Sequence, residues 1–284
     1  MGDEQPRPGV AFDHAALDAT ERLFWGDIWA ATPTPVANER GLASENFGPI
    51  FGLRLAALPQ VPMLNLLLGA GEAGATDDGH LAAAVEWFDS LGGHYYVPLY
   101  PGDPGAADAE TWLRQEGFGK GYGWMKFVRD AAPPEMPERP GVDVVELGAG
   151  EGEDFGAIVA AGFELPEWGA ALFSELPGRP GWRCYVAEVE GAAQGAAAMR
   201  IDDGVAEFGA AATLEGARGR GCQTELLRRR ILDAADADSR LLFVETGERV
   251  PGKPDASYRN ILRAGFEEAY VRPNWRREQP PTRD

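Results

Sequence analysis

The chain of 284 residues has little of what several classes of protein depend on. Its two cysteines, Cys184 and Cys222, form no CxxC pair, which excludes a disulfide scaffold and indicates a reducing compartment. Its three histidines, His14, His80 and His94, offer no metal-ligand spacing with those cysteines, so we expect no metal. It also lacks a run of about 18 apolar residues and an apolar leader, so we expect a cytoplasmic protein without a membrane span.

Positive charge is scarce as well. The chain has 45 acidic and 26 basic residues, a net charge of −19, which repels phosphate backbones and anionic lipid headgroups. We therefore expect no nucleic-acid or membrane partner. Nearly all of the positive charge is arginine, the side chain suited to bidentate phosphate contacts, so a phosphate ligand would require a local arginine cluster.

The sequence divides near its middle. Residues 131–140 contain four prolines, a composition that favours an extended linker, and we place a boundary there between residues 1–132 and 133–284. Similar segments, 112–118 and 260–266, precede the linker and the C-terminal end, and each reads as a helix, a glycine cap and a strand. Their recurrence about half a chain apart predicts a duplicated unit.

Hydrophobic periodicity predicts a mixed order of elements in the second half. The expected order is β-α-α-β-β-β-α-β-α-β, in which the three central strands form an antiparallel meander. The strands are expected at 142–147, 182–190, 195–201, 205–213, 241–245 and 268–271, and the helices at 153–161, 167–176, 224–237 and 257–264. In the first half we expect helices at 14–30, at 81–91 and around Trp112, with strands at 63–68, 95–99 and 124–128.

The most informative motif is RGRGCQ at residues 218–223. It follows a strand of small residues, FGAAAT at 208–213, and it opens an amphipathic helix. A strand, a glycine loop and a helix N-terminus form an anion site, because unpaired N–H groups and the helix dipole point at the ligand. The alternative is an ordinary glycine-rich turn beside a basic surface, since short glycine motifs recur by chance.

This segment resembles the acyl-CoA pyrophosphate loop of the GNAT superfamily of N-acyltransferases, Arg/Gln-x-x-Gly-x-Gly/Ala. Arg218, Gly221 and Gln223 fill its three positions, and glutamine at the third is a departure. The strand order of the second half and the segments 257–266 and 269–275 also resemble a two-halved bacterial branch. That resemblance implies a mixed α+β (α/β) fold of two tandem GNAT-like units, each a mainly antiparallel twisted sheet flanked by helices, with a degenerate first half.

The resemblance also implies N-acetyl transfer from acetyl-CoA to an amine, most simply that of a small molecule, by a monomer or a homodimer. The backbone of residues 211–213 would pair with pantetheine, residues 219–224 would hold the pyrophosphate, and Asn260 would add a polar contact. The implied cofactor-binding residues are Ala211, Ala212, Thr213, Arg218, Gly219, Arg220, Gly221, Cys222, Gln223, Thr224 and Asn260.

Direct attack on the thioester requires a base and an acid for the thiolate. No histidine lies in the second half, so a carboxylate is the expected base: Glu207, if strand alternation places it with Ala211 and Thr213, or Glu245. Either carboxylate could instead be structural. Ile261 stands where a tyrosine acid is common in the superfamily, and Tyr258 is the expected substitute; otherwise solvent protonates the thiolate, or the site is impaired.

Three alternatives remain open at this point. The protein could bind acyl-CoA without turning it over. VVELGAGEG at 144–152 resembles the first motif of S-adenosylmethionine-dependent methyltransferases, although parallel β-α units do not follow it. GAGEAG at 69–74 matches a dinucleotide fingerprint, but it lacks a partner acid and reads as a degenerate cofactor loop.

Overall fold

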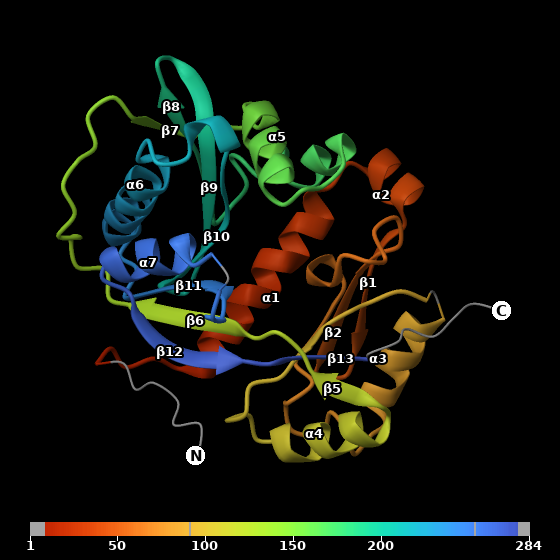
Figure 1. Cartoon of the computed structure of the whole chain (residues 1–284). Coiled ribbons are helices and arrows are strands. Elements are labelled where there is room, and N and C mark those ends of the chain that lie inside the picture. Colours follow the sequence, from red (N-terminus) through yellow and green to blue (C-terminus); the bar gives the residue numbers. More distant parts are fainter. Residues whose placement is uncertain (1–8, 91, 253, 278–284) are drawn as a thin grey trace. The chain divides into compact units, whose positions relative to one another are not determined.

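The computed structural model describes residues 9–90, 92–252 and 254–277. The N-terminal residues on which the expected absence of a leader rests, and Leu91 at the end of an expected helix, lie outside this description. The chain forms two compact units, and each unit combines separate parts of the sequence (Figure 1). Of the described residues, unit 1 contains 9–33 together with Lys126–Tyr270, and unit 2 contains Thr34–Met125 together with 271–277.

Unit 1 is built on a seven-stranded sheet in the order β12-β6-β11-β10-β9-β8-β7. Strands β7 to β10 form an antiparallel meander, and β10 then pairs with β11 in parallel. The strands are β6 (Trp124–Arg129), β7 (Asp143–Leu147), β8 (Trp182–Val189), β9 (Ala192–Asp202), β10 (Val205–Thr213), β11 (Leu241–Gly247) and β12 (Glu267–Arg272).

Helices cover both faces of this sheet. Arg230 of α6 lies over the ring of Phe208 at 4.6 Å, whereas Phe24 of α1 lies against the next residue of β10, Gly209. Because consecutive strand residues point to opposite faces, α6 and α1 pack on opposite sides. The helical segments are α1 (His14–Ala31), α5 (Glu153–Gly162), η2 (Glu167–Leu172), η3 (Glu215–Ala217), α6 (Cys222–Asp236) and α7 (Ala256–Arg263).

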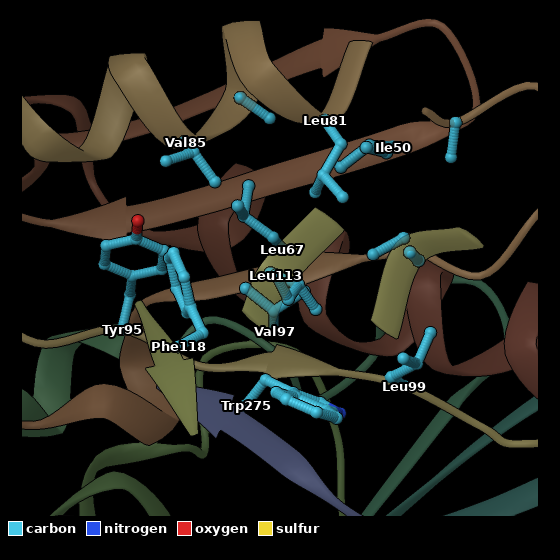
Figure 2. Packing of buried hydrophobic residues seen from close by; sticks show 14 of the residues in the cluster. Ile50, Leu67, Leu81, Val85, Tyr95, Val97, Leu99, Leu113, Phe118 and Trp275 are labelled. Carbon is cyan, nitrogen blue, oxygen red and sulfur yellow. The ribbon is translucent and has the colours of Figure 1, made fainter. Parts of the chain in front are cut away.

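Unit 2 contains two three-stranded antiparallel sheets, ordered β1-β2-β3 and β4-β13-β5. A parallel bridge between Leu66 and Tyr96 joins β3 to the chain just before β4. The elements are α2 (Thr34–Arg40), β1 (Leu42–Phe47), β2 (Ile50–Leu55), η1 (Pro62–Leu64), β3 (Leu66–Leu68), α3 (His80–Asp89), β4 (Val97–Pro98), α4 (Ala106–Gln115), β5 (Phe118–Lys120) and β13 (Asn274–Arg277). Figure 2 shows its core, in which Leu67, Leu113 and Trp275 are fully buried.

The two units exchange equivalent strands. In unit 1, β6 lies between β12 and β11; in unit 2, β13 lies between β5 and β4. Each of these strands follows a helix, a glycine of positive φ and a short strand, with Gly117 (φ 80°) in one case and Gly265 (φ 81°) in the other. The repeated order predicted from the sequence is therefore present. The last strand of the first half, β6, lies in the sheet of unit 1, and the last described strand of the second half, β13, lies in a sheet of unit 2.

The expected mixed α+β fold is confirmed, as are most of its elements. The helix expected at 167–176 is a shorter 3₁₀ turn, and α2, β1 and β2 were not predicted. The compact units cross the linear boundary at 132/133, because α1 and β6 pack into unit 1. As a boundary between two duplicated halves, 132/133 stays a prediction. Among the described helices, none is long and apolar enough to span a membrane.

Candidate functional site

The site begins where β10 separates from β11. Their parallel pairing runs from Val205 and Leu241 to Phe208 and Val244, and no further pair joins them among the described residues. Just beyond this point the register between β10 and β9 shifts between Gly209 and Ala212. Ala210, inside the shift, has φ 45°, a left-handed conformation that L-residues seldom adopt. A β-bulge therefore ends the ladder and bends β10 away from β11.

The bulge reverses the alternation of the strand. Phe208 contacts Arg230 of α6, and the Thr213 hydroxyl accepts a hydrogen bond from Gln223 Nε2 of the same helix at 3.3 Å. Phe208 and Thr213 are five positions apart on β10, and in a regular strand an odd separation places two side chains on opposite faces. Both can face α6 only because the bulge inserts an extra residue between them. Glu207, next to Phe208, therefore lies on the face opposite Thr213. The expected shared face of Glu207, Ala211 and Thr213 is wrong, because it assumed unbroken alternation.

The glycine loop leads directly into α6. Gly219 (φ 82°) and Gly221 (φ 100°) both take positive φ, and Gly221 is the cap from which the helix starts at Cys222. Positive φ at two positions accounts for glycine there, since other residues are strained in this conformation. The first N–H groups of α6 have no partner within the helix and point out of its N-terminus. The predicted order of strand, glycine loop and helix N-terminus is therefore present, and anion binding there stays a prediction.

A cavity of about 630 Å³ lies against this loop. All eleven residues predicted to contact the cofactor line it, from the bulged end of β10, the loop, the first turn of α6, and Asn260 on α7. Their binding of acetyl-CoA stays a prediction. The cavity also has lining residues that the sequence did not indicate: Arg139, Gly162, Ala217, Pro254, Ala256 and Ser257.

The two arginines of the loop differ in whether they form an ion pair, and the thiol of Cys222 is buried. Arg220 Nη2 lies 2.7 Å from Glu190 Oε1 in an exposed ion pair, whereas Arg218 has no ion-pair partner among the described residues. Cys222 is buried, and burial raises the pKa of its thiol above the ordinary value. Its sulfur is therefore held protonated, and a nucleophilic role has no support.

The second expected base, Glu245, belongs to a buried charge cluster. The Lys126 ammonium lies 2.9 Å from Glu245 Oε2 and 3.0 Å from Glu21 Oε2. The Lys126 and Glu21 side chains are 0% and 2% exposed, while that of Glu245 is 18% exposed. Neither Glu245 nor Glu207, which is itself buried, lines the cavity described above. Both assignments as base stay predictions.

Tyr258 lies in the core and not at the cavity. Its hydroxyl donates a hydrogen bond to Glu268 Oε1 at 2.5 Å, and its ring packs edge-on against Phe127. Burial, followed by the hydrogen bond and charge of Glu268, raises the pKa of Tyr258 above its ordinary value. Ser257 and Asn260 line the cavity, whereas Tyr258 does not. The role of Tyr258 as proton donor stays a prediction, and in the structure its hydroxyl is bonded to Glu268.

The two other glycine-rich segments, residues 148–152 and 69–74, lie in different structural contexts. Strand β7, which precedes residues 148–152, is an edge strand antiparallel to β8, so the parallel sheet of a methyltransferase is not formed around it. Residues 69–74 follow β3 and lead through a turn to α3, which begins after Gly79 in left-handed conformation. This is the same order as β10, loop and α6, so the segment has the position expected of a degenerate cofactor loop.

No known family profile matches the chain, and no curated protein sequence matches it significantly. Solved structures do match its fold. A GCN5-related N-acetyltransferase from Kribbella flavida is 18% identical, with a TM-score of 0.63 over 95% of this chain and 97% of its own. A tandem GNAT protein from the clavulanic acid biosynthesis pathway is 16% identical, with a TM-score of 0.54 over 97% and 98%.

A third match is a GCN5-related N-acetyltransferase from Sphaerobacter thermophilus. It is 16% identical, with a TM-score of 0.56 over 83% of this chain and 78% of its own. At such identities the likeness establishes the fold, and function has to be argued from the site.

Proposed function

Because the chain has the tandem GNAT fold, we propose that it is an N-acyltransferase that moves the acetyl group of acetyl-CoA to the amine of a small molecule. One observation carries this proposal: the cavity combines the end of β10, freed from β11 by the bulge, with the arginine and glycine loop that opens α6. An elongated ligand with an amide-bearing arm and a phosphate group suits these two kinds of surface.

The residues of the cavity fit acetyl-CoA by their chemistry. The small side chains of Ala211 and Ala212 leave the strand backbone open to the amides of pantetheine. The N–H groups from Gly219 to Thr224, with Arg218, would hold the pyrophosphate at the positive end of α6. Bound there, acetyl-CoA would supply a thioester that an amine can attack.

The chain's own carboxylates are the groups available to take the amine proton. Glu245 is partly exposed at the end of β11 and is oriented by Lys126, and Glu207 is buried on β10. The acidic surface also favours a cationic acceptor, because carboxylates attract cations toward a cleft. With Tyr258 committed to Glu268, protonation of the leaving thiolate falls to solvent.

A second candidate function is acyl-CoA binding without turnover. It is favoured by the same placement of Tyr258 and by Ile261, which is buried where the superfamily commonly has a tyrosine. Acceptor-dependent release of CoA separates the two functions. If Glu207→Gln and Glu245→Gln both leave turnover within about tenfold of wild type, the base assignment is wrong, since a true base contributes about 100-fold or more.

The first experiment is a thermal shift with acetyl-CoA, CoA and S-adenosylmethionine, each at saturation. A ligand at about 100 times its Kd stabilises the native state by about 2.7 kcal/mol, which raises the melting midpoint measurably. We expect acetyl-CoA to raise the midpoint, Arg218→Ala to reduce that shift, and the matched variant Arg240→Ala to leave it unchanged. Arg240 is exposed and paired with Asp203, away from the cavity. A shift with S-adenosylmethionine alone would refute the proposal.

A further inference from the structure

The end of the proline-rich linker is attached to helix α6. The backbone N–H of Arg139 donates to Glu225 Oε1 at 2.6 Å, and Glu225 is nearly buried in the first turn of the helix. One residue earlier, Glu138 Oε1 accepts a hydrogen bond from Arg228 Nη2 at 2.5 Å. Arg228 Nη1 also lies 3.6 Å from Glu225 Oε2. These contacts fix the linker beside the N-terminus of α6.

This attachment places the Arg139 side chain at the cavity. Arg139 is one of its lining residues, and a Cβ atom added to Gly221 would lie 3.1 Å from Arg139 Cγ. The stem of the arginine therefore passes over the glycine that caps α6. Both carboxylates near it, Glu138 and Glu225, are engaged by Arg228, and the Arg139 guanidinium pairs with no carboxylate among the described residues.

We propose that Arg139, supplied by the linker, binds a phosphate group in the nucleotide part of CoA. The inference rests on the proposed function. In a chain of net charge −19, arginines that gather at one place offset the repulsion of an anion, and Arg139 joins Arg218 and Arg220 at one cavity. Of these, Arg220 is paired with Glu190. Arg139 and Arg218 are therefore the guanidinium groups best placed to donate hydrogen bonds to a phosphate.

Two phosphate sources share this chemistry. The pyrophosphate would lie at the N-terminus of α6, over which Arg139 passes, and the 3′-phosphate of the ribose would lie beyond it. Both belong to the same ligand, so a series of truncated ligands separates them. Acetyl-CoA carries both groups, 3′-dephospho-acetyl-CoA keeps only the pyrophosphate, and S-acetyl-pantetheine has neither.

The test measures Kd for these three ligands by calorimetry with wild type, Arg139→Ala, Arg139→Lys and the control Arg240→Ala. We expect Arg139→Ala to weaken acetyl-CoA binding about tenfold, the value of one charge-assisted hydrogen bond, with partial recovery in Arg139→Lys. Binding of S-acetyl-pantetheine should be the same in every variant. Because Arg139 is exposed, the melting midpoint without ligand should not change, which verifies folding.

The outcomes separate this inference from the function on which it rests. A loss that persists with 3′-dephospho-acetyl-CoA assigns Arg139 to the pyrophosphate, and a loss that disappears with it assigns Arg139 to the 3′-phosphate. If wild type binds acetyl-CoA but Arg139→Ala binds it equally well, or if S-acetyl-pantetheine weakens by the same factor, the inference is wrong and the proposed function stands. If wild type binds no acetyl-CoA, both are overturned.

Discussion

Replacement of Lys126 by methionine should destabilise unit 1 severely. The ammonium group lies between Glu21 on α1 and Glu245 on β11, at 3.0 and 2.9 Å, and none of the lysine side chain is exposed. Methionine keeps much of the volume but removes the charge. The Glu21 carboxylate, 2% exposed, would then lose the ammonium group that lies 3.0 Å from it.

The expected loss follows from these burials. Removal of one partner of a buried ion pair costs about 3–5 kcal/mol, most of it from the charge left behind. Because Glu245 is partly exposed, water can solvate its carboxylate and offsets part of the cost of losing the Lys126 ammonium there. Converting Glu21 to glutamine as well removes the stranded charge, so Lys126→Met/Glu21→Gln should recover about 2 kcal/mol relative to Lys126→Met.

Urea denaturation followed by circular dichroism measures these free energies of unfolding in a double-mutant cycle. Lys120→Met is the matched control, because Lys120 is half exposed and lies 3.5 Å from Glu110 in a surface pair worth at most about 1 kcal/mol. If Lys126→Met costs no more than Lys120→Met, or if Glu21→Gln gives no recovery, the reasoning is refuted.

Three further predictions concern the site and its surroundings. Ala210→Val should lower the free energy of unfolding by about 2 kcal/mol, because a β-branched residue is strained at φ 45°; an unchanged urea midpoint would contradict the bulge. Burial raises the pKa of Tyr258, so its stabilising bond to Glu268 is fully present below about pH 10 and is lost at higher pH. The stability difference from Tyr258→Phe should therefore shrink in alkaline melts, while CoA release at neutral pH should not change. Gly162→Ala places a methyl group against Ala212 and should cost about 1–3 kcal/mol and weaken acetyl-CoA binding, and a gain of stability would contradict this packing.

The conformation of the glycine loop before α6 was predictable because its signals are local. A strand of small residues, two glycines and a helix start follow one another within about twenty residues, and each is fixed by backbone conformation. The bulge at Ala210 was not predictable, since alanine gives no sign of a positive φ. That single inserted residue reverses which side chains of β10 beyond it face α6, so Glu207 and Thr213 lie on opposite faces of the strand.

Other features depend on contacts that a linear sequence does not express. Strand β1 carries no buried side chain, so it has no apolar alternation to detect. The sequence predicted a strand close to β6 but not β13, and it did not show which sheet either strand joins. Arg139 was interpreted only as part of a linker, because its position at the cavity depends on Glu225 and Arg228, which lie almost ninety residues later.

The exchanged strands also constrain how the protein is made. Unit 1 needs α1 and β6, which are synthesised before the linker, and it needs β12, which is synthesised near the end. Unit 2 begins earlier, yet the strand between β4 and β5 is missing until residues 274–277 have left the ribosome. Nascent domains usually fold in order of synthesis, but here the seven-stranded sheet and the β4-β13-β5 sheet are both incomplete until residues 267–277 have been translated. A ribosome stalled at the linker would hold a chain in which β4 and β5 lack the strand that lies between them, so the sheet of unit 2 that contains them cannot be completed before β13 is made.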